Sequence, residues 1–393
     1  MRNRRVLISG AGIAGPTLAY WLLRHDFTPT LVERAPALRT GGYMIDFWGI
    51  GYNVAERMGL LPALQRDGYR LEEVRLVNAS GQRVSGFDAR VFQAASHGRY
   101  TSLLRGDLAH DIYELVAEQV ETIFDDSIAA LHEETADVAV TFERTPPRRF
   151  DLVVGAGGLH SNVRRLAFGR GTNFETYLGY YTAAFSADRY PHRDEGAYVS
   201  YSVPGAQVAR YALRAGRSAF LFVLARDEPL AAAHEPAAQR ALLRETFAGA
   251  GWECDEILAA MDRADDLYFD AVAQVHMPAW STGRVALVGD AAYCPSLLAG
   301  QGSALAMAGA YLLAHALAAS AGDYQEAFAD YQQRFKPFVD AKQRAAARLG
   351  AWFAPRTAWG IRLRNLGTSL MRLPVIGDLV AARSFADRME LPE

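Results

Sequence analysis

The sequence predicts an α/β protein: a Rossmann-like nucleotide-binding domain, interrupted by an inserted α+β domain on a mainly antiparallel sheet and followed by C-terminal helices. Three observations predict this class. A glycine-rich strand–helix–strand pattern occupies residues 5–33, residues 177–224 alternate aromatic and polar side chains, and a buried-type strand leading to Gly289-Asp290 comes late in the chain. The first domain is therefore expected to be assembled from segments far apart in the sequence.

Composition and charge are those of an ordinary globular protein. The 393 residues exceed one typical core, and the net charge of −3 with no basic block argues against a nucleic-acid partner. Two cysteines give neither a disulfide framework nor a metal site. The longest apolar stretch, 304–319, is shorter than a membrane span, so we expect no integral membrane association. With no signal peptide before the first strand, we expect a cytoplasmic monomer or homodimer.

The first chemical motif lies in the N-terminal strand–helix–strand pattern. Its glycines fit G-x-G-x-x-G, which lets the backbone turn tightly and approach a pyrophosphate at a helix N-terminus. An acidic residue ends the second strand, where its carboxylate can accept hydrogen bonds from ribose hydroxyls, as in FAD or NAD. The residues expected to contact the dinucleotide are Gly10, Gly12, Ile13, Ala14, Gly15, Glu33 and Arg34.

The remaining helices and strands are predicted from hydrophobic periodicity and from the positions of glycine and proline between the periodic segments. Helices are predicted over residues 49–58, 106–119, 236–247 and 254–261, and mostly helical chain over 323–388. Strands are predicted within 70–103 and 123–142 and over 150–154 and 267–274. The expected domains are a discontinuous dinucleotide-binding domain (1–76, 97–175 and 275–340), an inserted substrate domain (77–96 and 176–274) and a C-terminal helical region (341–393).

Four motifs together narrow the class of cofactor. They are the N-terminal fingerprint, residues 103–108 (LLRGDL), residues 151–158 (DLVVGAGG) and residues 289–302, which begin Gly-Asp-Ala-Ala and end Gly-Gln-Gly. In these motifs the chain resembles the class A flavoprotein monooxygenases, the group that contains para-hydroxybenzoate hydroxylase and the tetracycline-inactivating monooxygenases. Residues 41–46 (GGYMID) are similar to the tetracycline-inactivating branch in particular.

The resemblance implies further cofactor contacts. It implies that Asp290 hydrogen-bonds the ribityl chain of FAD, and that Arg105 contacts the same cofactor. Asp46 matches an acidic flavin contact, and Arg39 lies near an arginine implicated in NADPH binding. Backbone amides of Gly300, Gln301 and Gly302 are expected beside the pyrimidine edge of the flavin, where a helix N-terminus stabilises negative charge on the reduced ring.

Two departures from the family pattern stand out. Gly157-Gly158 replaces an Asp-Gly pair whose carboxylate helps to organise both FAD and NAD(P)H in relatives, which puts rapid reduction by the nicotinamide in doubt. The run Gly155-x-Gly157 also mimics a second fingerprint, but no second strand–helix–strand unit follows. In the late motif Tyr293 replaces a histidine, and Pro295-Ser296 replaces a proline pair, so the backbone beside the flavin is expected to differ.

The resemblance implies an FAD-dependent monooxygenase that hydroxylates an electron-rich aromatic or polycyclic, polyketide- or tetracycline-like molecule. NAD(P)H would reduce the non-covalently bound FAD, and dioxygen would give a flavin C4a-hydroperoxide. No catalytic side chain is singled out, because the cofactor carries the chemistry. One alternative is a flavoprotein that binds a ligand without hydroxylating it. Another is a flavin-dependent halogenase, which would need a lysine near the flavin, whereas Lys336 and Lys342 are the only lysines.

Other candidates have simpler interpretations. His160 and His276 are isolated histidines, which are more often structural than catalytic. A set of aromatic residues at alternating strand spacing is mostly core, with about one in three expected to line a pocket for a flat substrate. This set is Tyr180, Tyr181, Phe185, Tyr198, Tyr201, Tyr211, Phe220 and Phe222.

Overall fold

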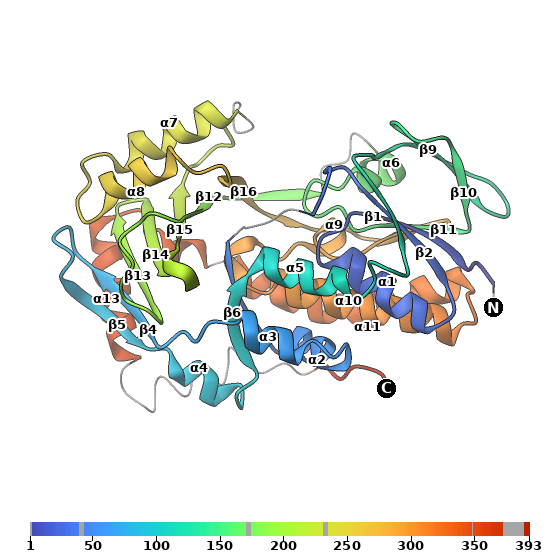
Figure 1. Cartoon of the computed structure of the whole chain (residues 1–393), viewed down its shortest axis with the longest axis horizontal. Helices are drawn as coiled ribbons and strands as arrows, with labels where there is room; N and C mark the ends of the chain where they lie inside the picture. Colours follow the sequence, from blue (N-terminus) through green and yellow to red (C-terminus); the bar gives the residue numbers. More distant parts are fainter. Residues whose placement is uncertain (1, 39–42, 170–173, 231–234, 348, 372–388) are drawn as a thin grey trace.

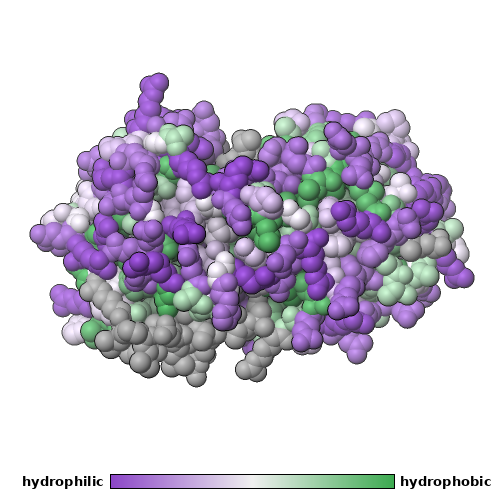
Figure 2. All heavy atoms as spheres, turned by 60° about the horizontal axis from the view of Figure 1, so that its bottom comes forward, coloured by the Kyte–Doolittle hydropathy of each residue, from purple (hydrophilic) through white to green (hydrophobic). Residues whose placement is uncertain are grey.

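The structure of the chain is a computed structural model, which describes all residues except 1, 39–42, 170–173, 231–234, 348 and 372–388. It confirms the α/β class: a mainly parallel sheet with helices in one lobe, and a mainly antiparallel sheet in the other (Figure 1). The long strands β12 and β16 run from one lobe to the other (Figure 1). Hydrophilic side chains cover most of the face in Figure 2, and apolar ones are scattered among them.

The first lobe is built on a six-stranded sheet. All neighbouring strands in it are parallel except β17 and β18, and β1 lies inside the sheet between β11 and β2. Val6, Leu7 and Ile8 of β1 are fully buried, as a strand covered on both faces requires. In spatial order the strands are β17 (Ser281–Thr282), β18 (Val285–Leu287), β11 (Leu152–Gly155), β1 (Arg5–Ser9), β2 (Thr28–Glu33) and β7 (Glu121–Phe124).

Helices from both ends of the sequence complete this lobe. Helix α10 packs against α1, α2 and α11. Within the described ranges, α10 is the one helix long and apolar enough to cross a bilayer, but 72% of it is buried inside the protein. The helices are α1 (Ala14–Arg24), α2 (Ile50–Arg57), α3 (Leu61–Asp67), α5 (Arg105–Glu114), α6 (Asn162–Phe168), α9 (Asp290–Tyr293), α10 (Gly302–Ala319) and α11 (Tyr324–Ala346).

Two small sheets flank the six-stranded one. One is antiparallel and contains β8 (Ile128–Glu133), β9 (Val138–Phe142) and β10 (Arg148–Phe150). The other pairs β3 (Met44–Trp48) with β6 (Tyr100–Leu104). The single strand predicted over 150–154 is in fact divided between β10 and β11. Asp151 separates them, because its carboxylate accepts hydrogen bonds from the backbone N–H and the guanidinium of Arg5.

One predicted helix is shorter than expected. Helix α5 ends at Glu114, whereas the sequence predicts helix to residue 119. The N–H of Val116 bonds to the carbonyl of Tyr113, three residues back, and Gln119 bonds to Val116 in the same way. These three-residue bonds alternate with four-residue bonds from Ala117 to Tyr113 and from Val120 to Val116, so residues 115–119 form turns rather than regular α-helix.

The second lobe is built on a seven-stranded sheet. Its neighbouring strands are antiparallel except β4 and β13. Strand β4 spans the expected domain boundary between residues 76 and 77, and the division into domains stays a prediction. In spatial order the strands are β16 (Tyr268–Val275), β12 (Glu175–Ala187), β15 (Ser218–Ala225), β14 (Ala206–Ala212), β13 (Ala197–Val203), β4 (Glu73–Val77) and β5 (Arg83–Asp88).

The two faces of the seven-stranded sheet have different partners. Helices α7 (Pro236–Phe247) and α8 (Cys254–Met261), both predicted from the sequence, cover one face. The other face contacts β3, β6, the turn at 297–298 and the late helices. Those and the remaining helices are α4 (Arg90–Ala95), α12 (Gly350–Phe353) and α13 (Ala358–Leu370).

The predicted aromatic set divides between these faces. Phe185, Tyr201, Phe220 and Phe222 belong to the core under α7 and α8. Tyr198, Tyr211 and Tyr180 lie on the face toward the first lobe. Tyr181 stacks on Phe269 of β16. Strand alternation therefore separates core aromatics from those that can face a ligand.

Tyr293 is a core residue rather than a cofactor contact. Its ring is 1% exposed and packs against Trp280 and Phe335. Its hydroxyl accepts a hydrogen bond from Tyr331 at 3.0 Å. A Cβ on Gly309 of α10 would overlap that hydroxyl, so the tyrosine at this position requires a glycine opposite it.

We predict that Gly309→Ala destabilises the protein by about 1–3 kcal/mol, because it overpacks the contact with Tyr293. Thermal unfolding of the FAD-loaded protein measures the effect. Gly367→Ala is the matched control, since Gly367 is also helical but has no atom within 4 Å of its added Cβ. That control should hold or raise the unfolding temperature. Equal midpoints for the two variants would contradict the prediction.

Candidate active site

The glycine-rich turn after β1 lies against the end of β11. Gly10 has a φ of +115°, and a Cβ on it would lie 2.6 Å from the carbonyl oxygen of Ala156. A Cβ on Gly15 would overlap the carbonyl oxygen of Gly10. Helix α1 then begins at Ala14, with Ile13 as its N-cap and no side chain capping it. Its first N–H groups are therefore available to an anionic ligand such as a phosphate.

Glu33 closes this turn from the end of β2. Its Oε2 accepts a hydrogen bond from the N–H of Ala11 at 2.9 Å, and its Oε1 accepts one from the N–H of Ala35 at 3.0 Å. Each carboxylate oxygen keeps a second lone pair that can accept a hydrogen bond from a sugar hydroxyl. The carboxylate is thus held in place by the backbone and still able to bind a ribose.

Arg105 connects the glycine-rich turn with the late motif. It begins α5, and its backbone N–H donates to the carbonyl of Tyr43 at 3.1 Å. Its Nη2 lies 3.4 Å from the position that a Cβ on Gly12 would occupy. Its charge also acts on Asp290, where it favours the ionised carboxylate. The guanidinium of Arg105 therefore lies beside the early glycine-rich motif and within electrostatic range of the late one.

Asp290 is half-buried at the start of α9. Burial raises the pKa of its carboxyl group, while the charge of Arg105 and a hydrogen bond with Cys294 act in the opposite direction. The preceding residue, Gly289, has a φ of +67°, and a Cβ on it would lie 3.1 Å from the Cβ of Ala14. The late turn is therefore packed directly on the start of α1.

The start of α10 lies beside the same carboxylate. A Cβ on Gly302, the first residue of α10, would lie 3.5 Å from Oδ1 of Asp290. Gln301 is the N-cap, and no side chain caps this helix either. Gly300 is left-handed with a φ of +65°, and a Cβ on it would lie 3.7 Å from the ring of Trp48. Two uncapped helix N-termini, those of α1 and α10, thus meet around Arg105 and Asp290.

Asp46 lies apart from this convergence. In β3, its Oδ1 accepts hydrogen bonds of 2.6 Å from the hydroxyls of Tyr100 and Ser102. Burial raises the pKa of its carboxyl group, and those two hydrogen bonds oppose the rise. Its charge acts on Tyr198 and Tyr211 of the seven-stranded sheet. The structure therefore places it where the two lobes meet.

Two further arginines, Arg34 and Arg39, are predicted from the sequence to contact the cofactors. Arg34 follows Glu33, the last residue of β2, and is exposed. Arg39, expected near the nicotinamide, lies outside the described residues, as do the first two residues of the 41–46 motif.

His160 has a partner that the sequence does not reveal. Its Nε2 lies 3.0 Å from Oδ2 of Asp270 in β16. The hydrogen bond and charge of Asp270 raise the pKa of His160 against the effect of burial, and Arg34 is close enough to act on it. The hydroxyl of Tyr268 reaches the same carboxylate at 3.4 Å. The pair lies 110 residues apart in sequence, so no local motif could indicate it.

The two departures from the family pattern, at Gly157 and in the turn that contains Ser296, differ in their backbone geometry. A Cβ on Gly157 would lie 3.6 Å from the Cα of Ser161, an ordinary contact, and the φ of Gly157 is not positive. An aspartate at 157 is therefore accommodated by the backbone. Ser296 has a φ of +106°, which serine seldom adopts, so the backbone before Gly300 is strained.

The described residues fit a flavin dinucleotide. The glycine-rich turn leaves no space for side chains at Gly10 and Gly15, as a backbone cradle for a pyrophosphate requires. Glu33 supplies acceptors for a ribose, and two uncapped helix N-termini supply N–H donors for negatively charged groups. Backbone amides and one arginine suit the phosphates of a dinucleotide, and the half-buried carboxylates of Glu33 and Asp290 can accept hydrogen bonds from its sugar hydroxyls.

Comparisons with known proteins agree with this geometry. A model of the FAD binding domain family matches residues 3–345. An uncharacterized protein of Mycobacterium tuberculosis is 41% identical over 345 residues, covering 86% of this chain and 92% of that protein. A flavin-dependent monooxygenase of Legionella longbeachae is 36% identical over 360 residues and 89% of each chain. The crystal structure of tetracycline destructase Tet(55) superimposes with a TM-score of 0.85, 32% identity and full coverage of both chains.

Fold and site together therefore define an FAD-dependent monooxygenase. The chain belongs to the class A flavin monooxygenases, the family predicted from its motifs. FAD is its cofactor, and NAD(P)H is the co-substrate typical of this family.

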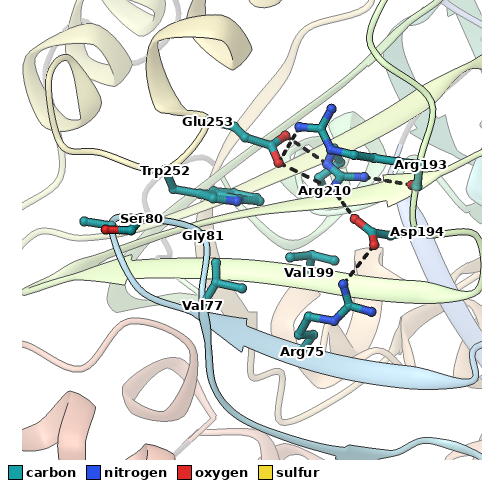
Figure 3. Close-up of a pocket in the computed structure, with 11 residues that line it drawn as sticks. Arg75, Val77, Ser80, Gly81, Arg193, Asp194, Val199, Arg210, Trp252 and Glu253 are labelled. Carbon is teal, nitrogen blue, oxygen red and sulfur yellow. Dashed lines mark hydrogen bonds and ion pairs between the residues drawn. The ribbon is translucent and has the colours of Figure 1, made fainter.

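Apart from the candidate active site, a hollow of about 350 Å³ lies on the face of the seven-stranded sheet that α7 and α8 cover, beside α8 (Figure 3). Arg210 of β14 is its most buried charged group, with a side chain 1% exposed. Arg210 bonds Asp194 at 2.6 Å and Glu253 at 3.0 Å, Arg75 bonds Asp194 at 2.8 Å, and Arg193 bonds Glu253 at 2.6 Å (Figure 3).

The charges of this hollow are satisfied by one another. Burial disfavours ionisation of Asp194 and Glu253, but their hydrogen bonds and the neighbouring arginine charges prevail, so both pKa values lie below the usual range. A ligand would have to displace internal ion pairs. We therefore interpret this network as a brace that holds β4, β13, β14 and α8 together.

We predict that Arg210→Met destabilises the protein by about 3–5 kcal/mol, because it leaves two partly buried carboxylates without their central cation. Chemical denaturation at neutral pH measures the loss. Both carboxylates have lowered pKa values in the folded protein, so their stabilisation is present above the unfolded pKa of about 4 and is lost as the pH falls. The difference in free energy of unfolding between Arg210→Met and wild type should therefore become smaller at acidic pH. Arg244→Met, which removes an exposed ion pair with Asp262, is the control and should unfold like wild type.

Proposed function

We propose that this monooxygenase hydroxylates an electron-rich aromatic or polycyclic small molecule, polyketide- or tetracycline-like, with NAD(P)H and dioxygen. The observation that carries the proposal is the convergence of Gly12, Arg105, Asp290 and the start of α10 beside the seven-stranded sheet. That sheet presents Tyr180, which packs with Leu298 immediately before the convergence. A flat substrate would lie between the sheet and the flavin.

The proposed cofactor contacts follow the geometry. The N–H groups at the start of α1 would bind the pyrophosphate, with Gly10 and Gly15 allowing its close approach. Glu33 would bind the adenosine ribose, and Asp290 would accept a hydrogen bond from the ribityl chain. The uncapped start of α10 would face the pyrimidine edge of the flavin and stabilise negative charge there.

When bound, FAD supplies the activation of dioxygen. The chain itself would orient the substrate and keep water away from the reacting atoms. The buried surroundings of Asp290, including Tyr43, whose pKa burial raises to about 12, form a low-dielectric wall suited to that purpose. A cytoplasmic location and a monomeric or homodimeric state stay predictions.

Transfer of labelled oxygen tests the proposal. The FAD-loaded protein is first screened against planar phenols and polyketides for changes in flavin absorbance. The ligands that bind are then incubated with NAD(P)H under ¹⁸O₂, and we expect one labelled oxygen atom in the product by mass spectrometry. Binding without incorporation would instead support a flavoprotein that holds a ligand without hydroxylating it. A halogenase is disfavoured, because both lysines lie on α11 and Lys336 pairs with Asp340.

We predict that Glu33→Ala weakens FAD binding by about 1–3 kcal/mol, because ribose hydroxyls lose their acceptor. Titration of the apoprotein with FAD, followed by flavin fluorescence, measures the affinity. Glu121→Ala is the control, since Glu121 lies in the same sheet but pairs with Arg148 at the surface. An unchanged FAD affinity in Glu33→Ala would remove Glu33 from the site.

We predict that Gly157→Asp speeds reduction of the flavin by NAD(P)H several-fold, because it restores the carboxylate that organises both cofactors in relatives. The backbone at 157 accommodates the change without strain. Anaerobic stopped-flow absorbance in the presence of a bound ligand measures the rate. Gly157→Ala adds the Cβ without the charge and should leave the rate near that of wild type. A slower Asp variant would identify Gly157 as an adapted feature of this chain.

A further inference from the structure

Helix α13 turns its polar side toward the protein. Trp359 is 76% exposed and Leu363 is 69% exposed, whereas Arg364 is only 8% exposed and Thr368 only 2%. A surface helix usually buries its apolar stripe and exposes its charges. This helix does the reverse against β5 and β13. Hydrophobic burial therefore does not explain why Arg364 faces inward.

Among the residues that the structure describes, the side chain of Arg364 is held by neutral groups only. Its Nη2 donates to Oγ of Ser202 at 3.1 Å, and its Nη1 donates to Oε1 of Gln207 at 3.3 Å. Nη1 also lies 3.4 Å from the carbonyl oxygens of Trp352 and Phe353. Throughout the part of the chain that the structure describes, no carboxylate pairs with this guanidinium, whose pKa burial lowers to about 10.

A buried cation without an anion is costly. Dipoles of hydroxyls, amides and carbonyls offset only part of the lost hydration of a guanidinium. Arg210, on the other face of the same sheet, is also buried but has two carboxylate partners. The difference indicates that Arg364 receives its counter-charge from something other than the described protein groups.

Next to Arg364, strands β13 and β14 present a polar strip on the same face. It consists of three directly opposed pairs, Tyr198 with Tyr211, Ser200 with Ala209, and Ser202 with Gln207. Gln207 links Arg364 to the far end of the strip, because its Nε2 donates to the hydroxyl of Tyr198 at 3.1 Å.

Two atoms of the strip lack a partner. Oγ of Ser200 is buried, as is the hydroxyl of Tyr211, and neither has a hydrogen-bond partner among the described residues. Buried hydroxyls are normally satisfied, so each needs an explanation. A polar ligand that lies along the strip would supply partners to both and an anion to Arg364.

This face of the sheet is the one turned toward the cofactor region. Tyr198 and Tyr211 share a cluster with Trp48, the ring beside Gly300. Further along the same face, Val223 and Tyr180 pack with Leu298. The strip therefore borders the place where the proposed function puts the substrate.

We propose that Arg364 is the anion receptor of the substrate site and that this enzyme takes a substrate carrying an acidic oxygen, a carboxylate or an ionised enol. This inference rests on the proposed function, since it names the class of substrate. The acidic oxygen binds the guanidinium between Ser202 and Gln207, and further oxygens of the molecule bond Ser200 and Tyr211. A neutral analogue leaves the buried charge uncompensated and binds more weakly.

The test compares an acid with its neutral ester. The FAD-loaded enzyme is titrated with 1-hydroxy-2-naphthoic acid and with its methyl ester, and flavin absorbance reports binding. We expect the wild type to bind the acid at least about tenfold more tightly than the ester. Arg364→Gln should abolish this preference, and Arg364→Lys, which keeps the charge, should retain part of it. Arg362→Gln, on the exposed side of α13, should behave as wild type.

Three outcomes would overturn the proposal: equal binding of acid and ester, no binding of either, or an acid preference that survives in Arg364→Gln. FAD content and unfolding temperature show whether the variants are folded. If Arg364→Gln fails to fold, Arg364→Lys is compared with wild type instead. Because lysine keeps the positive charge, a complete loss of the acid preference in Arg364→Lys would overturn the proposal. The proposed function is tested separately, and it fails if no labelled oxygen enters any product. Even then, the preference for the acid over the ester can still be measured, because it is a binding property.

Discussion

The backbone of Gly10 lies against the backbone of Ala156, and that contact determines where the functional parts of the chain meet. With no side chain between them, β1 and β11 end side by side and the turn into α1 lies directly over the end of β11. Gly289 packs on Ala14 for the same reason, so the late motif reaches the same point. Close backbone packing, added to the hydrogen bonds of the sheet, therefore brings these turns together beside Arg105 and Asp290.

The seven-stranded sheet separates two electrostatic environments. On the side of α8, three arginines form ion pairs with Asp194 and Glu253, and one of them, Arg75, also pairs with Glu73. The buried Arg210 at the centre has two carboxylate partners. On the side of the cofactor region, Arg364 is buried and its partners among the described residues are all neutral. The first arrangement joins strands and helices into one body. The second leaves a charge and two hydroxyls available to a molecule that enters.

The three departures from the family pattern, at Tyr293, Ser296 and Gly157, have different structural consequences. Tyr293 fills the core between Trp280 and Phe335, and the glycine at 309 makes room for its hydroxyl, so this change is one of packing. Ser296 instead leaves the backbone with a positive φ in the turn before Gly300. Gly157 leaves ordinary space beside the pyrophosphate cradle. Of the three, Gly157 and Ser296 lie next to residues of the proposed cofactor site, Gly10 and Gly300 respectively.

The sequence by itself determined the features that depend on short-range rules. Spacing of Gly10, Gly12 and Gly15 between a strand and a helix predicts the cradle, because backbone geometry there needs glycine whatever the rest of the chain does. Periodicity predicts α7 and α8 to the residue, and strand alternation predicts an antiparallel sheet. The family resemblance rests on such local motifs and is confirmed by the FAD binding domain match.

Only the tertiary structure decided which distant side chains meet. His160 and Asp270 form a pair because β16 returns to the first lobe, a consequence of sheet order rather than of local pattern. Arg364 is one of 41 basic residues, and in the sequence nothing separates it from Arg362 two positions earlier. Its burial follows from the packing of α13 on β5 and β13, which sets one arginine against Gln207 and leaves the other at the surface. Such contacts depend on long-range packing, and periodicity within a single helix carries no information about them.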